Sequence, residues 1–172
     1  MSIGTIIADH AKLSLSYANR MLADVPADKF ARFAMGENGL IESNHPAFIY
    51  GHLSLYSPRI VEHFGGDMSE ITPSDKFIEA FDQSAQCVDD PDGTIYPAME
   101  EITSKLIKST ELAIETIATA SDEELLKPNA NEKMAKYFAT NGSMMGFYLS
   151  GHIMIHMGQM SAWRRMIGLG PA

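Results

Sequence analysis

Residues 141–168 read NGSMMGFYLSGHIMIHMGQMSAWRRMIG and predict one long helix. The stretch begins with Asn-Gly-Ser and ends before Leu-Gly-Pro, which are residue types that commonly flank a helix. Within it, His152 and His156 are four residues apart, so both imidazoles lie on one helical face, about 6 Å apart along the axis. Gln159 and Trp163 continue this face. The helix therefore presents two nitrogen ligands side by side.

A histidine pair at this spacing is only a weak sign of a metal, and a third ligand is needed. His52, in the segment NHPAFIYGHLSLY, is the candidate, because it lies in the middle of a predicted helix. It follows Gly51, which has no side chain and lets a neighbouring backbone come close. Three imidazoles would leave open coordination positions for water or substrate. The alternative is that the histidines are ordinary helix residues without an ion, and the spacing alone does not decide between the two.

The apolar pattern predicts two further long helices. Residues 2–23 carry apolar side chains at intervals of three and four, and Ser2 is available as the N-cap. Residues 97–120 show the same spacing. From Ser121 onward, the Ser-x-x-Glu pattern begins a short additional helix.

The remaining long helix is less regular. We expect it to begin at the capping residue Asn44 and to end before the glycines at 65–66. Pro58 lies within it and should kink it after Ser57, because proline has no N–H to donate. A shorter helix is expected in residues 74–83.

These helices make up the predicted fold. No window combines alternating apolar and polar residues with β-branched enrichment, and residues 33–43 are rich in turn formers, so we expect no strand. Residues 1–172 have the length of one domain. The prediction is an all-α four-helix bundle with a long crossover between the second and third long helices, in which side chains on facing helices build the site.

Composition limits the partners and the compartment. Acidic residues number 22 against 13 basic ones, a net charge of −9, so nucleic acid and anionic membrane surfaces should be repelled. The start of the chain lacks the features of a signal peptide, and polar residues interrupt the apolar stretch 144–160, so no membrane span is expected. Cys87 is the only cysteine and cannot form an internal disulfide, which fits a reducing compartment. We expect a cytoplasmic protein.

Gly51-His52-Leu53 and residues 152–159, HIMIHMGQ, match the Gly-His and His-x-x-x-His-x-Gly-Gln patterns of a known family. On these motifs the chain resembles, over its whole length, the DinB-like (damage-inducible) family of three-histidine metalloenzymes. The resemblance implies a bundle with up-down-down-up topology, a homodimer, and zinc or nickel held by His52, His152 and His156. Relatives that use low-molecular-weight thiols imply such a thiol as the small-molecule co-substrate.

The expected function is that of a metal-dependent enzyme, a thiol-dependent S-transferase or isomerase acting at an open three-histidine site. The alternatives are a non-catalytic, stress-related protein that binds a metal or ligand, and a metal-dependent hydrolase. A zinc peptidase of the His-Glu-x-x-His type is excluded, because Ile153 stands where the glutamate is needed. No catalytic acid or base is assigned from the sequence.

Two further residues are candidates for orienting the metal ligands without binding the metal themselves. Gln159 is polar on an otherwise inward face and could orient a ligand or a bound water. His10 could point toward the site from the first helix, although a lone helical histidine is more often a packing residue. His45 is expected to serve the start of the second helix rather than the metal.

Overall fold

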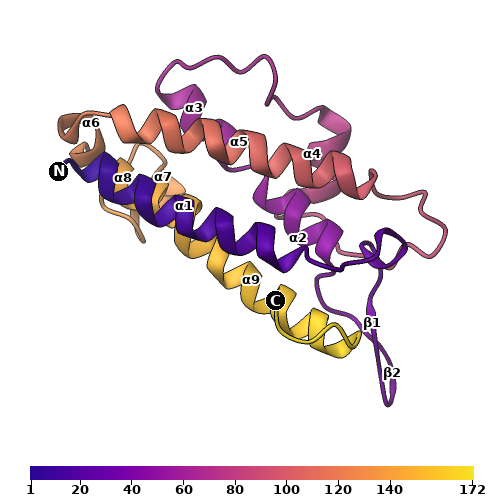
Figure 1. The fold of residues 1–172 in the computed structure, drawn as a ribbon. Coiled ribbons are helices and arrows are strands. Elements are labelled where there is room, and N and C mark those ends of the chain that lie inside the picture. The colour runs from indigo at the N-terminus through magenta and orange to yellow at the C-terminus, as the bar shows by residue number, and fades with distance from the viewer.

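The computed structural model describes residues 1–172, and nearly all of its regular structure is helical (Figure 1). The all-α prediction is confirmed at this level, and the up-down-down-up bundle topology stays a prediction. None of the helices combines the length and the apolar composition that crossing a membrane requires. In chain order the elements are α1 (Ile3–Met21), η1 (Ala27–Lys29), β1 (Ala34–Gly36), β2 (Gly39–Ile41), α2 (Pro46–Leu53), α3 (Ser57–His63), α4 (Asp75–Phe81), α5 (Met99–Thr119), α6 (Asp122–Leu126), α7 (Glu132–Ala135), α8 (Asn141–Gly146), η2 (Phe147–Gly151) and α9 (His152–Met166).

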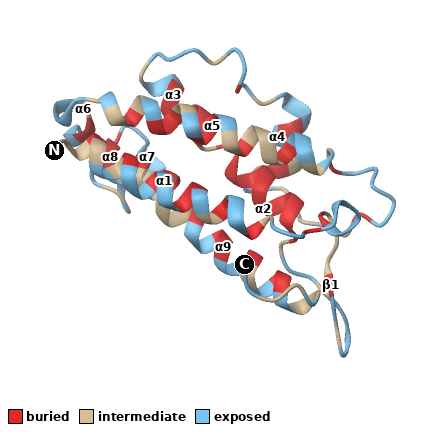
Figure 2. Cartoon of the chain, viewed as in Figure 1, coloured by how far each residue is buried: buried red, intermediate tan, exposed pale blue.

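The long helices pack side by side. α1 contacts both α5 and α9, and α2 contacts the same two helices from the other side of the core. Every residue of α2 is buried, as Figure 2 shows, which explains why its sequence lacks a clear polar face. A helix enclosed in this way can hold a polar side chain in a fixed, dry position. That position is where His52 lies.

A small antiparallel hairpin is the first difference from the prediction. β1 pairs with β2 in the register Ala34 with Ile41, Met35 with Leu40 and Gly36 with Gly39. Met35 and Leu40 are exposed, so no alternation of buried and exposed side chains marks these strands in the sequence. The expectation of no strand was therefore wrong for these residues.

The second long helix is divided into α2 and α3. α2 ends at Leu53, next to which the Ser54 hydroxyl donates a hydrogen bond to the carbonyl oxygen of Gly51, and α3 begins at Ser57. Pro58 lies in the first turn of α3, where a missing N–H leaves no bond unmade. The predicted kink after Ser57 was wrong, because the break comes before Pro58 rather than at it.

The caps agree with the prediction at two helices, since Ser2 caps α1 and Ser121 caps α6. The short helix expected in residues 74–83 is present as α4 and is capped by Ser74. The N-cap of α2 is His45 rather than Asn44, since its Nδ1 accepts a hydrogen bond from the backbone N–H of Phe48. The prediction that His45 serves the helix start is confirmed.

The C-terminal helix contains one turn of π-helix, η2, between α8 and α9. A π turn has one more residue than an α turn and changes the direction in which the following side chains point. It ends immediately before His152. Nothing in the sequence predicted it.

Candidate metal centre

The three predicted histidines lie together between α2 and α9. Each offers one ring nitrogen, and these nitrogens are all within 4.8 Å of one another. The ring of His52 is 5.3 Å from the rings of both His152 and His156, measured between centroids. The prediction that one histidine of the second helix meets the pair on the last helix is confirmed.

The backbone carbonyl of Phe81 sets the orientation of the His52 ring. Nδ1 of His52 lies 2.8 Å from the carbonyl oxygen of Phe81, which can only accept, so Nδ1 carries the proton and Nε2 has a free lone pair. Gly51 makes this contact possible, because a Cβ at that position would lie 2.6 Å from Cγ of the Phe81 ring. The neighbour for which Gly51 leaves room is thus an aromatic side chain, and not a backbone as we expected.

Gln159 sets the orientation of His156. Nδ1 of His156 lies 2.8 Å from Oε1 of Gln159, and the amide of Asn44 donates to the same oxygen at 3.3 Å. Because this oxygen accepts, Nδ1 of His156 is the protonated nitrogen and Nε2 has the lone pair. The contact that we expected between Gln159 and a ligand histidine is present.

His152 has the least support of the three. Its Nε2 is 3.2 Å from Nε2 of His156 and donates to it, since the latter nitrogen has no proton. Its Nδ1 is buried without any hydrogen-bond partner. A buried polar atom without a partner costs about 1–3 kcal/mol, and His152 is the one candidate ligand whose second ring nitrogen has no supporting hydrogen bond.

Burial keeps the three imidazoles neutral. It is the largest cause that lowers the pKa of His52 and of His156. The pKa of His152 falls to about 3, first because of burial and then because of repulsion from His156 and His52. Neutral imidazole is the form that binds a metal, so the donors need not lose a proton to the solvent first.

This donor set fits a divalent transition metal. Such ions take neutral imidazole nitrogens whose second nitrogen is hydrogen-bonded, as in His52 and His156. Tetrahedral zinc with Zn–N bonds of 2.0–2.1 Å separates its nitrogens by about 3.4 Å, and the His152–His156 pair at 3.2 Å is close to this value. No carboxylate or thiol belongs to the cluster. A bound ion would keep coordination positions that the protein does not fill.

No family model, curated protein or solved structure matches the chain. The resemblance to the DinB-like family therefore stays a prediction. The metal site is supported by the geometry of the three histidines themselves.

Tyr56 is the residue at this site that the sequence reasoning missed. Its hydroxyl lies 3.2 Å from Nε2 of His52 and donates to it, because that nitrogen has no proton. Its ring is 4.6 Å from the ring of His152 and perpendicular to it. Burial raises the pKa of Tyr56, so the phenol stays protonated. The available signal was its position four residues after His52, on the same side of the helix.

His10 does not belong to the site. Its side chain is exposed on α1, and it is not among the three clustered histidines. The expectation that it points inward was wrong, because the inner face of α1 is made by Ala11 and Ser14, with Ser14 donating to the hydroxyl of Ser150 on the last helix.

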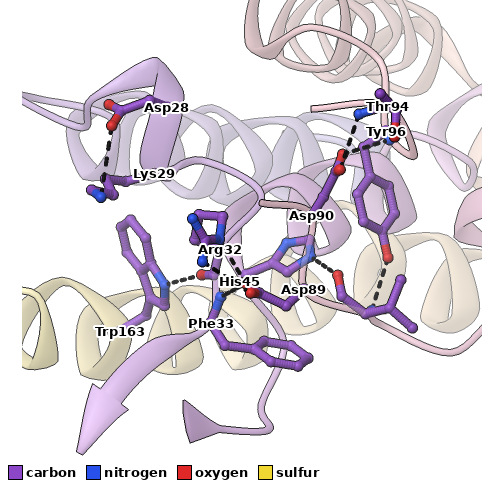
Figure 3. Close-up of polar contacts among 11 residues, drawn as sticks. Asp28, Lys29, Arg32, Phe33, His45, Asp89, Asp90, Thr94, Tyr96 and Trp163 are labelled. Atoms are coloured by element: carbon purple, nitrogen blue, oxygen red, sulfur yellow. Dashed lines mark hydrogen bonds and ion pairs between the residues drawn. The ribbon is translucent and has the colours of Figure 1, made fainter. Parts of the chain in front are cut away.

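A polar network holds the start of α2, and with it His52, in place (Figure 3). Nε2 of His45 donates to the carbonyl oxygen of Val88 at 2.9 Å, and burial lowers the pKa of His45, which stays neutral. Nearby, Arg32 forms a two-bond ion pair with Asp89 at 2.9 and 3.0 Å. The indole N–H of Trp163 donates to the carbonyl oxygen of Arg32, which ties α9 to the same network.

Proposed function

We propose that this chain is a metal-dependent enzyme in which His52, His152 and His156 hold one divalent transition metal, zinc or nickel. The observation that carries the proposal is the convergence of three neutral imidazoles from facing helices, two of them fixed by hydrogen bonds at the far ring nitrogen. Structural zinc normally has four protein ligands. A three-ligand cluster without a neighbouring carboxylate or thiol favours catalysis over a purely structural site.

A metal in this position would supply Lewis acidity that lowers the pKa of a coordinated water or thiol. The carbonyl of Phe81 and the amide of Gln159 hold two ligand rings in their orientation. The phenol of Tyr56 provides a proton donor beside His52. The buried aromatic surroundings of His52 exclude water on the side of Phe48, whose ring stacks on the imidazole.

We further propose that a low-molecular-weight thiol is the co-substrate, in a transfer or isomerisation reaction. The DinB-like resemblance supports this proposal. On the same ground we propose that the protein is a cytoplasmic homodimer and that its bundle has up-down-down-up topology. Hydrolysis at the same metal is the competing reaction class, because coordinated water and thiol would be activated in the same way.

The metal site is tested by the metal content of untagged protein. About one ion per chain is expected, because three imidazoles suffice for a catalytic zinc site. His52→Ala, His152→Ala and His156→Ala should each lose most of it. His10→Ala is the matched control and should retain the ion, since His10 is exposed outside the cluster. Full occupancy in the triple variant would disprove the assignment.

The reaction class is tested by giving zinc- and nickel-loaded protein a panel of thiols with an electrophile, and separately a panel of esters. Thiol turnover that disappears in His152→Ala would support the proposal. Ester turnover alone would make the protein a hydrolase. No turnover with a bound, exchangeable ion would favour the non-catalytic metal-binding alternative.

A further inference from the structure

The polar stripe that contains His52 continues beyond the metal centre. His52, Tyr56 and Arg59 are spaced by four and three residues across the end of α2 and the start of α3. The guanidinium carbon of Arg59 lies 4.9 Å from the centre of the Tyr56 ring. On the facing helix, the ring of Tyr148 is 4.7 Å from that of Tyr56. Tyr56 and Tyr148 therefore both lie against the ring of His152, and Arg59 lies against Tyr56.

Two of these groups lack a protein partner. The guanidinium of Arg59 is exposed and forms no ion pair or hydrogen bond, and the Tyr148 hydroxyl forms none although the residue is only 9% exposed. By contrast, the guanidinium of Arg32 is paired with Asp89, and that of Arg164 donates to backbone carbonyls. The side chains next to the metal centre are thus free to bind something else.

None of the nearby carboxylates forms an ion pair with Arg59. Glu62 and Asp75 line a hollow of about 400 Å³ that Arg59 borders, but neither lies within ion-pair distance of it. Oδ1 of Asp82 accepts from the backbone N–H groups of Ser84 and Ala85 and from the Ser84 hydroxyl, and Asp82 forms no ion pair with Arg59. In a chain of net charge −9, Arg59 is a free positive charge at the edge of the site.

We propose that Arg59, Tyr56 and Tyr148 form an oxyanion subsite beside the metal centre, so that the substrate carries a carboxylate or phosphate group at the end away from the metal. This inference rests on the proposed function. A guanidinium offers a planar fork of donors that matches both groups, and stacking on Tyr56 orients the fork in advance. The Tyr148 hydroxyl, which has no protein partner, adds a donor. The Tyr56 hydroxyl donates to His52, so Tyr56 contributes the ring on which the guanidinium stacks.

The first test uses metal-free protein, so that it does not depend on the proposed reaction. Sodium propionate and inorganic phosphate are titrated separately while the ring signals of Tyr56 and Tyr148 are followed by NMR. Saturable shifts are expected with at least one anion, and the comparison tells a carboxylate subsite from a phosphate subsite. Arg59→Gln should abolish the shifts, and Arg59→Lys should keep the charge but weaken binding, because an ammonium lacks the fork.

Arg20→Gln is the matched control. Arg20 is also exposed, is stacked on a tyrosine three residues earlier at 4.6 Å, and lies on α1 outside the site. It should leave the titration unchanged. Equal shifts in wild type and Arg59→Gln, or no shift with either anion, would overturn the subsite.

The second test uses protein loaded with cobalt(II), whose absorption spectrum reports a sulfur ligand. The dissociation constants of 3-mercaptopropionate and of neutral 2-mercaptoethanol are compared. Wild type should prefer the anionic thiol about tenfold, as expected for one charge-assisted hydrogen bond, and Arg59→Gln should lose that preference. A preference that persists in Arg59→Gln would contradict the proposal. If neither thiol changes the spectrum, the thiol part of the proposed function fails, and the metal-free titration decides on the subsite by itself.

Discussion

Replacing Gly51 by alanine should damage both the fold and the metal centre. The new methyl group would lie 2.6 Å from Cγ of Phe81, and this ring is fully buried against Phe48, Phe77 and Tyr96, so it cannot move aside freely. Overpacking of this kind costs about 1–3 kcal/mol, whereas alanine gains about 1 kcal/mol over glycine inside a helix. Because the new methyl group would overlap three atoms of the Phe81 ring, Cδ1, Cε1 and Cγ, the clash should cost about 2–3 kcal/mol and leave a net loss of about 1–2 kcal/mol in the free energy of unfolding.

The same change should weaken metal binding. Because the buried Phe81 ring has no room to rotate aside, the clash should be relieved by a shift of the Phe81 backbone, which moves its carbonyl away from Nδ1 of His52. Losing such a supporting hydrogen bond typically lowers metal affinity about 10- to 100-fold. Urea unfolding should show a midpoint lower by about 0.5–1 M, given a slope of about 2 kcal/mol/M. Competition with a chromophoric chelator measures the affinity for zinc.

Gly158→Ala is the control for this prediction. Gly158 is in α9, two residues after His156, is exposed, and has no atom within 4 Å of the position of a Cβ. The variant should gain up to about 1 kcal/mol from helix propensity and bind zinc as wild type does. If Gly51→Ala unfolds at the same urea concentration as wild type and binds zinc equally well, the packing argument is wrong.

Four further predictions concern two residues next to the ligands, the carboxylate of Asp90 and the oligomeric state. Gln159→Leu removes the oxygen that accepts the hydrogen bond from Nδ1 of His156, and chelator competition should show a zinc affinity about tenfold lower. The loss should be smaller than for a buried hydrogen-bond partner, because Gln159 is exposed. Unchanged affinity would show that Gln159 does not support the ligand. Tyr56→Phe frees Nε2 of His52 from the phenol, so zinc should bind about 3- to 10-fold more tightly, and weaker binding would mean that the hydroxyl supports the ion instead. Burial alone would raise the pKa of Asp90, but hydrogen bonds from the backbone N–H groups of Tyr96, Thr94 and Ile95 outweigh it and lower the pKa. Its ionised form therefore stabilises the fold above the unfolded pKa of about 3.9, and this contribution should disappear as pH falls from there through the lower folded pKa. Urea titrations should show a smaller acid loss of stability for Asp90→Asn than for wild type, because the carboxylates of Asp82 and Asp89, whose pKa values are also lowered, still contribute in the variant. Light scattering at micromolar concentration should give the mass of a homodimer, and a strictly monomeric mass would reject that part of the proposal.

The histidine cluster could be predicted because its signal is local. His152 and His156 share a helical face by their spacing alone, and His52 differs from its apolar neighbours in a buried helix. The role of Gln159 could be predicted for the same reason, because it lies one turn further along the same helix. Capping by Ser2 and Ser121 also depends on the few residues that follow each cap.

The missed features depend on contacts that no local pattern records. The end of α2 at Leu53 depends on a hydroxyl-to-carbonyl bond and on the packing of α3, and Pro58 proved a misleading marker of the break. The exposed hairpin has no buried face to produce alternation. The role of Tyr56 became visible only when α9 brought His152 against its ring.

The π turn at residues 147–151 coincides with a division in the core. Met145 and Leu149 pack with α3 and the end of α5, whereas Ile153 and Met157, after the turn, pack with α2. Five residues in a π turn rotate the chain about as far as four residues of α-helix do, so deleting one residue there would restore an α turn and leave the rotation of α8 relative to α9 nearly unchanged. The core packing of α8 and the histidine face would therefore both be kept. In a lineage of such chains, one residue could be gained or lost at this turn while the packing partners of α8 and the spacing of the metal ligands stayed the same.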